Sequence, residues 1–130
     1  NSTLAGHVTV QDYVILAGMV AVHQFCNIGT HAFIAGGSLV RKDIPPFVKA
    51  AREPLSYVGI NSVGLRRRGF ESAKIREIQN IYRILYQKKY NNTQAIDIIE
   101  AEVEATKARD EILLFIRNSQ RGIMKGYIQN

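Results

Sequence analysis

Aliphatic residues recur along the first third of the chain at a strict interval of six. Small or β-branched residues follow four positions after each of the first six of them. An amphipathic strand repeats every two residues and a helix every 3.6, so neither produces this spacing. The pattern is typical of a triangular solenoid in which each hexad forms one short parallel strand. The aliphatic series is Leu4, Val10, Leu16, Val22, Ile28, Ile34 and Val40, and the compact series is Val8, Val14, Val20, Cys26, Ala32 and Ser38.

Both series are expected to point inward, so Leu4, Val22 and Val40 should stack in one column. Glycines suit the tight turns between faces, and they stand here as Gly6, Gly18, Gly29, Gly36 and Gly37. The repeat is expected to end at residues 43–46, because two prolines cannot join a ladder of backbone hydrogen bonds. Residues 4–40 make about two coils, and at least about three repeats are normally needed for stability. We therefore expect the chain to be a fragment that lacks earlier coils.

Beyond about Phe70 the spacing of apolar residues becomes helical. A first helix is expected up to the break at residues 90–92, a second after Thr93 as its N-cap, and a third over about 109–118. The predicted organisation is the last coils and cap of a solenoid in residues 1–58, followed by a small helical domain in residues 59–130. The expected core positions of the three helices are Ile75, Ile78, Tyr82 and Leu85, then Ile96, Ile99 and Val103, then Ile112, Leu113 and Ile116.

The charge of the chain is concentrated in its middle. The formal net charge is +6, and residues 61–90 hold eight Lys or Arg against two Asp or Glu. A local excess of this kind favours an anionic partner. No apolar run is long enough to span a membrane, and the single cysteine, Cys26, cannot form an internal disulfide. A reducing, cytoplasmic setting is the simplest interpretation.

Two histidines fall on the same predicted face in successive coils. His7 and His23 both point outward in the hexad frame, and strands about 4.8 Å apart should bring them into one polar patch with Gln24. His31 falls on the next face. Zinc needs three or four converging ligands, and the three histidines are not in the register that zinc-binding solenoids such as γ-class carbonic anhydrases use. We expect no metal.

The second candidate site is the basic motif Asn61-Ser62-Val63-Gly64-Leu65-Arg66-Arg67-Arg68-Gly69-Phe70. Arginine presents a planar fork that suits phosphate oxygens. On a short helix the three arginines point in different directions, so at most two can serve one ligand. An RNA-binding helix is an alternative, but no aromatic residues interleave with the arginines as a stacking platform requires.

Taken together, these motifs resemble the bacterial UDP-N-acetylglucosamine O-acyltransferases of lipid A biosynthesis. The resemblance rests on Ala5-Gly6-His7, on Val22-His23-Gln24-Phe25 and on the motif around the three arginines, and it extends over essentially the whole chain. It implies a left-handed parallel β-helix, a cytoplasmic homotrimer and active sites between subunits. It also implies transfer of an (R)-3-hydroxyacyl chain from acyl carrier protein to the glucosamine 3-hydroxyl of UDP-N-acetylglucosamine, without metal, cofactor, nucleic acid or stable membrane insertion.

The resemblance also implies roles for individual residues. The backbone N–H of Gly6 would stabilise the oxyanion. The sugar, the pyrophosphate or the acyl hydroxyl would be held by His7, His23 and Gln24. Asn61 would contact the uracil end, Arg67 and Arg68 the phosphates, and Gly36 would lie where the acyl chain ends.

Two departures from the family pattern matter. The family's general-base histidine lies one coil before His7, on a coil that this chain lacks, so the fragment alone is expected to be inactive. Val63 stands where the family often has an acidic residue, which weakens the expectation for uracil. The alternatives are another hexapeptide-repeat acetyltransferase and a non-catalytic trimerising module that binds ligand.

Overall fold

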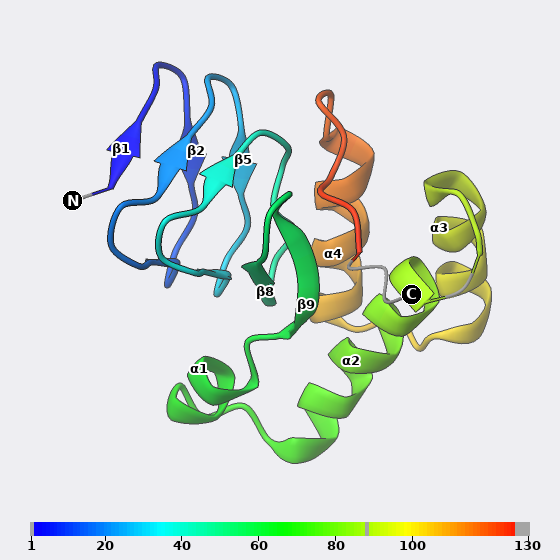
Figure 1. Cartoon of the computed structure of the whole chain (residues 1–130). Coiled ribbons are helices and arrows are strands. Elements are labelled where there is room, and N and C mark those ends of the chain that lie inside the picture. The colour runs from blue at the N-terminus through cyan, green and yellow to red at the C-terminus, as the bar shows by residue number, and fades with distance from the viewer. Residues whose placement is uncertain (1, 88, 127–130) are drawn as a thin grey trace.

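The computed structural model describes residues 2–87 and 89–126, and it begins with short strands at intervals of six residues. Each of the first four strands pairs in parallel with the third strand after it, which gives the sheets β1-β4-β7 and β2-β5 and the pair β3-β6. The predicted short parallel strands are thereby confirmed (Figure 1). They are β1 (Thr3–Leu4), β2 (Thr9–Val10), β3 (Ile15–Leu16), β4 (Ala21–Val22), β5 (Asn27–Ile28), β6 (Phe33–Ile34) and β7 (Leu39–Val40).

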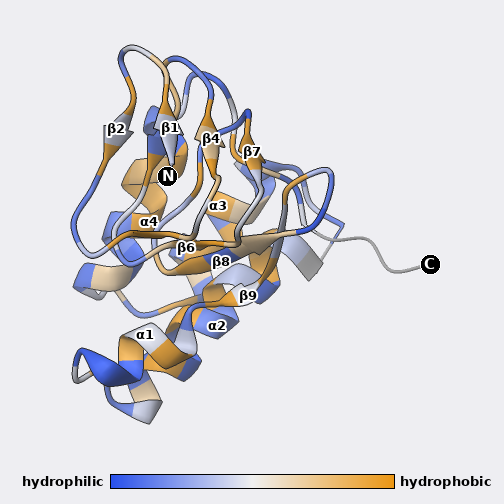
Figure 2. Ribbon diagram, turned by 60° about the vertical axis from the view of Figure 1, so that its left-hand side comes forward, coloured by the Kyte–Doolittle hydropathy of each residue, from blue (hydrophilic) through white to orange (hydrophobic). Residues whose placement is uncertain are grey.

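The aliphatic column predicted from the repeat is present. Leu4 is in register with Val22, and Val22 with Val40. Val22 and Val40 are 3% and 0% exposed, whereas Leu4 is 48% exposed. Among the described residues, Leu4 pairs with Val22 on one side only, whereas Val22 pairs with both Leu4 and Val40. Hydrophobic colour gathers along the strands of the solenoid in Figure 2.

Left-handed residues mark the corners of the solenoid. His7, Tyr13, Met19, Phe25 and His31 have φ between 59° and 67°, again at intervals of six. Gly37 continues the series with φ 75°. A positive φ is uncommon for residues other than glycine. In the first coils the left-handed turn position is therefore held by large side chains, and Gly6 and Gly18 stand one residue before it.

The prediction that the repeat ends at residues 43–46 is wrong. Ile44 bridges in parallel to Ile28, and β8 (Val48–Ala51) pairs in parallel with β6, so one more coil is begun. The paired residues Ile28 and Ile44 are 16 positions apart in the sequence, whereas paired residues of the earlier coils are 18 positions apart. Pro45 and Pro46 are buried in the corner of this shortened coil. Proline is tolerated there because the turn needs no ladder hydrogen bond from it.

An antiparallel strand follows the last parallel strand of the solenoid. Strand β9 (Ser56–Ile60) pairs with β8 and leads into the helices. The predicted boundary between residues 58 and 59 lies within β9, and the division into two domains stays a prediction.

The described residues after β9 form the helices α1 (Ser62–Arg67), α2 (Ser72–Gln87), α3 (Asn92–Glu102) and α4 (Lys107–Asn118). The N-cap of α3 is Asn91, which forms a capping box with Gln94, so the prediction of Thr93 is wrong by two residues. Thr106 caps α4. The predicted core residues are buried, except Ile96, which is partly buried.

The helices pack against the capped end of the solenoid (Figure 1). Tyr82 on α2 donates to the carbonyl oxygen of Pro46 at 2.5 Å, and Ser119 after α4 donates to Asp43 at 2.5 Å. Tyr57 on β9 stacks on Tyr86 of α2 with ring centroids 4.5 Å apart, and burial raises the pKa of Tyr57 to about 12. Among the helices of the described residues, none has the length and apolar composition to cross a bilayer.

Candidate functional site

The predicted site residues of the first coils lie on exposed corners. Gly6, His7, His23 and Gln24 are all exposed. His7 stacks on Phe25, the left-handed residue of the next coil, with centroids 5.0 Å apart and rings 11° from parallel. The His23 Nδ1 atom lies 3.4 Å from Nη2 of Arg121. The two imidazoles therefore share the β1-β4 side of the solenoid but have different partners.

Arg121 was not among the residues predicted for the site. Its guanidinium donates to the carbonyl oxygen of Arg41 at 3.2 Å, while Lys42 donates to the carbonyl oxygen of Arg121 at 3.1 Å. These contacts hold a cation beside His23. Because Arg121 is 98 residues from His23 in sequence, no local pattern could have joined them.

Asn61 and Arg67 line one cavity of about 210 Å³ beside α1. Lys49 of β8 lines it as well, a residue that no sequence motif indicates. Two cations and an amide thus surround an open hollow, an arrangement that can bind an anion. The other residues that line the cavity are Ile15, Phe33, Ile60, Ser62, Val63 and Gly64.

Asn61 is also the N-cap of α1. Its Oδ1 accepts from the backbone N–H of Gly64 at 3.3 Å, and its Nδ2 donates to the carbonyl oxygen of His31 at 2.9 Å. A side-chain amide has two N–H donors and two lone pairs. These contacts use one of each, so one donor and one lone pair of the Asn61 amide take no part in them.

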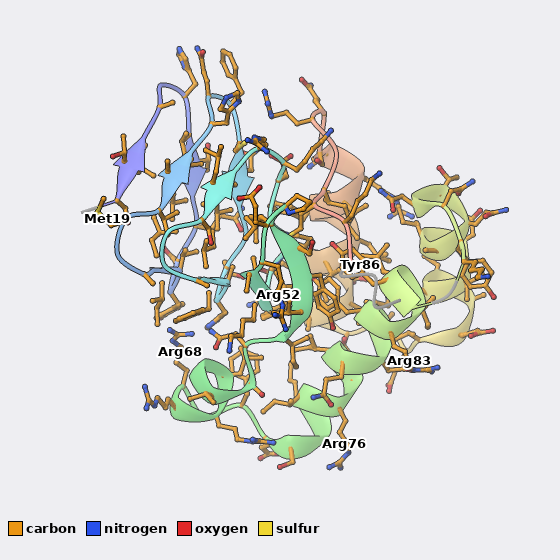
Figure 3. All side chains as sticks on the ribbon, viewed as in Figure 1. Met19, Arg52, Arg68, Arg76, Arg83 and Tyr86 are labelled. Atoms are coloured by element: carbon orange, nitrogen blue, oxygen red, sulfur yellow. The ribbon has the colours of Figure 1, made fainter. Side chains whose placement is uncertain are left out.

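Arg68 points away from this cavity and toward the corners of the solenoid. It lies between α1 and the solenoid in Figure 3. Its Nη1 is 3.2 Å from Nδ1 of His31, and its guanidinium carbon lies 5.5 Å from the ring centroid of Tyr13. Arg67 and Arg68 therefore diverge, as expected of consecutive arginines on a short helix. The hydrophilic C-terminal end of α1 is visible in Figure 2.

Gly36 stacks directly above Gly18 of the preceding coil. A Cβ at position 36 would lie 3.1 Å from the Gly18 carbonyl oxygen and 3.8 Å from Cβ of Ala17. Gly36 is exposed, as expected, but the first atom of a side chain there would press on the neighbouring backbone. At Gly6, by contrast, a Cβ would meet no described atom within 4 Å.

The described residues hold no group of three or more His, Cys, Asp or Glu side chains that could bind a metal ion. The polar groups at the candidate sites are histidines, an amide, arginines and a lysine. Such groups bind anions, donate hydrogen bonds and move protons.

Comparison with known proteins gives a consistent result. Residues 43–124 match the family described as "Udp N-acetylglucosamine O-acyltransferase; Domain 2". An acyl-[acyl-carrier-protein]–UDP-N-acetylglucosamine O-acyltransferase of Aliivibrio salmonicida is 43% identical over 125 residues, which are 96% of this chain and 48% of the relative. A Myxococcus xanthus protein of the same name is 42% identical over 118 residues, with 91% and 46% covered.

Solved structures agree. A UDP-N-acetylglucosamine acyltransferase from Bacteroides fragilis superposes with a TM-score of 0.94 at 46% identity, covering 95% of this chain and 49% of that one. The Francisella novicida enzyme gives 0.90 at 40% identity, covering 95% and 46%. The chain thus spans about half the length of the relatives it matches. Within that span, its sequence and its fold show that it belongs to the UDP-N-acetylglucosamine O-acyltransferase family.

Proposed function

We propose that this chain is part of an enzyme that moves an (R)-3-hydroxyacyl chain from acyl carrier protein to the 3-hydroxyl of UDP-N-acetylglucosamine, the first step of lipid A biosynthesis. The observation that carries the proposal is the 43% identity to the Aliivibrio salmonicida acyltransferase across 96% of this chain. The exposed histidines and the cationic cavity support it, because they suit a sugar and a diphosphate.

In the proposed reaction the sugar hydroxyl oxygen attacks the thioester carbonyl carbon, and a histidine on a preceding coil takes the hydroxyl proton. The backbone N–H of Gly6 stabilises the oxyanion of the tetrahedral intermediate. The intermediate collapses by breaking its carbon–sulfur bond, and the proton passes to the departing thiol of the carrier protein. His7, His23 and Gln24 hold the sugar, the pyrophosphate or the acyl hydroxyl.

We assign the uracil end to Asn61, and phosphate contacts to Arg67 and Arg68. Arg67 shares its cavity with Asn61 and Lys49, whereas Arg68 faces the corner at Tyr13. Since the two guanidinium groups diverge, they serve two different active sites of a homotrimer. Gly36 lies where the acyl chain ends.

The remaining properties belong to the same proposal. The complete protein is a cytoplasmic trimer built on a left-handed, hexapeptide-repeat prism. Residues 1–58 form its last coils and cap, and residues 59–130 form the C-terminal helical domain. The enzyme needs no cofactor and neither binds nucleic acid nor inserts stably into a membrane.

Donor choice tests the proposal against a related enzyme that uses acetyl-CoA. The protein to assay is a hybrid in which this chain is joined to the part of the Aliivibrio salmonicida relative that it does not match. With UDP-N-acetylglucosamine, 3-hydroxyacyl carrier protein and acetyl-CoA present together, mass spectrometry should find the 3-hydroxyacyl ester. An acetylated sugar as the main product would reject the proposed donor.

A further inference from the structure

His31 contacts both ends of helix α1. We propose that His31 is a positioning residue, whose neutral imidazole holds the Arg68 guanidinium in place for a diphosphate and releases it when the ring is protonated. This inference rests on the proposed function in one respect, namely that Arg68 binds the diphosphate of the nucleotide sugar.

The imidazole of His31 is fixed from several sides. It lies in a column of corner rings, stacked on Tyr13 with centroids 4.8 Å apart and on Phe47 with centroids 5.6 Å apart. Phe70 meets it edge-on at 5.1 Å. These contacts restrict rotation of the ring, so its Nδ1 atom is presented to Arg68 at 3.2 Å.

The same residue anchors the other end of α1. The carbonyl oxygen of His31 accepts from Asn61, the N-cap, while its ring faces Arg68, the C-cap. A helix of six residues is far too short to be stable alone. The direction of α1, and with it the direction of Arg68, therefore depends on contacts with this corner of the solenoid.

The partner of His31 determines its protonation state. A guanidinium has only N–H donors, so the Nδ1 atom beside it must accept, which requires a lone pair and a neutral ring. Four titratable or charged groups surround the ring: Asp12 and Tyr13 from the preceding coil, Arg68 from α1 and Glu111 from α4. Burial and then Arg68 lower the pKa of His31, against Glu111 and Asp12, which raise it. A proton on Nδ1 would bring the imidazolium of His31 into contact with the guanidinium of Arg68. The Arg68 side chain would then move away from His31.

Two substitutions at position 31 distinguish the effect of the aromatic ring from the effect of the Nδ1 hydrogen-bond acceptor. His31→Phe keeps an aromatic ring in the column but removes the acceptor, and Phe25 and Phe47 already occupy this kind of corner with φ 67° and 70°. His31→Asn keeps a side-chain acceptor close to the position of Nδ1, cannot titrate, and tolerates a positive φ. Rescue by asparagine but not by phenylalanine is a result that a purely structural role of the ring would not produce.

The first arm of the test needs no ligand. The imidazole signal of His31 is titrated by NMR in the 130-residue chain. The Arg68→Ala variant should raise the pKa of His31, since it removes a neighbouring positive charge. An unchanged pKa would overturn the inference whatever the protein binds.

The second arm measures affinity for UDP-N-acetylglucosamine, whose esterified pyrophosphate keeps its charge between pH 5 and pH 8. At pH 7 we expect His31→Phe to bind about 2–10-fold more weakly, the cost of one hydrogen bond to the positioned group, and His31→Asn to bind like the wild type. Affinity of the wild type should fall on acidification more steeply than that of His31→Asn, which still carries His7 and His23.

The outcomes distinguish the role of Arg68 in binding from the role of His31 in positioning Arg68. If Arg68→Ala leaves affinity unchanged, or if the chain binds no nucleotide sugar, the proposed role of Arg68 fails, and the NMR arm alone judges the His31 contact. If Arg68→Ala weakens binding but His31→Phe does not, the role of Arg68 stands and the inference about His31 is overturned. Equal losses in His31→Asn and His31→Phe would also overturn it.

Discussion

The backbone nitrogen of Pro46 lies 2.5 Å from the point where a Cβ atom of residue 29 would be. Gly29 is therefore required by the close approach of the shortened coil, not by its own backbone angles. This contact explains how the chain passes two prolines without leaving the solenoid. It also explains why the register changes at this coil, where the prolines form the corner.

The first prediction follows from that contact. Gly29→Ala should lower the free energy of unfolding by about 1–3 kcal/mol, the usual cost of overpacking a core, because proline backbone cannot move aside as a flexible side chain can. Gly18→Ala is the matched control, since a Cβ there meets no described atom within 4 Å. Urea unfolding of both variants checks this. Equal stability of the two variants would contradict the account of the corner.

The second prediction concerns the junction between α2 and the solenoid. Tyr82 is 0% exposed, and its hydroxyl donates to the Pro46 carbonyl oxygen. Tyr82→Phe should destabilise the chain by about 1–3 kcal/mol, because a buried acceptor loses its donor. Tyr90→Phe, at a 42% exposed position, should change stability little. Denaturant unfolding of the pair measures the difference, and a neutral Tyr82→Phe would show that water replaces the lost donor.

The third prediction is a pH dependence of stability. The pKa of His31 is lower in the folded chain than its ordinary value of about 6.5. Between these two pKa values the unfolded chain binds more protons, so stability rises with pH there and is lost as pH falls through the folded pKa. Above about pH 6.5 the contribution is fully present.

The control for this pH dependence is His31→Asn, which lacks the titrating group. Chemical unfolding at pH 7.5, 6.5 and 5.5 should show a steeper loss of stability in the wild type than in the variant. Parallel curves would mean that the folded and unfolded pKa values of His31 do not differ.

The fourth prediction concerns acyl chain length in the hybrid enzyme. Gly36→Met should shift preference toward shorter acyl donors, because its side chain would occupy the space in which we propose that the acyl chain ends. Each methylene displaced from a buried groove forfeits about 0.8 kcal/mol, so discrimination should grow with length. Competition between long and short acyl carrier proteins measures the shift.

Gly36→Ala serves as the control for strain. It adds the Cβ that lies 3.1 Å from the Gly18 carbonyl oxygen without filling the groove. The two variants should therefore share a loss of stability but differ in selectivity. An unaltered donor ratio in Gly36→Met would reject the assignment of Gly36.

Much of the fold could be predicted because the repeat depends on the spacing of aliphatic residues that are close in the sequence. Leu4, Val22 and Val40 stack because a strict interval of six places them on the same face of successive coils. The helical stripe of Ile75 and Ile78 is equally local. The shortened coil was missed because its two prolines resemble a stop signal unless the fit of Pro46 against Gly29 is known.

The candidate site was only partly predictable for a related reason. Residue types could identify His23 and Arg68 as candidates, but their partners come from distant parts of the chain. Arg121 reaches His23 across 98 residues, and Arg68 reaches His31 across 37. Such contacts depend on how the helices pack on the solenoid, which composition and periodicity do not specify.

The most direct measurement is transfer of a labelled 3-hydroxyacyl chain from acyl carrier protein to UDP-N-acetylglucosamine, with the hybrid enzyme compared with the 130-residue chain alone. We predict turnover by the hybrid, because it includes the coil on which we propose the general base. For the chain alone we predict a rate lower by at least about 10²–10⁴-fold, the usual contribution of a positioned base. A hybrid that folds but transfers no acyl chain would contradict the proposed function. Comparable turnover by the chain alone would place the base within these residues, with His7 as the first candidate.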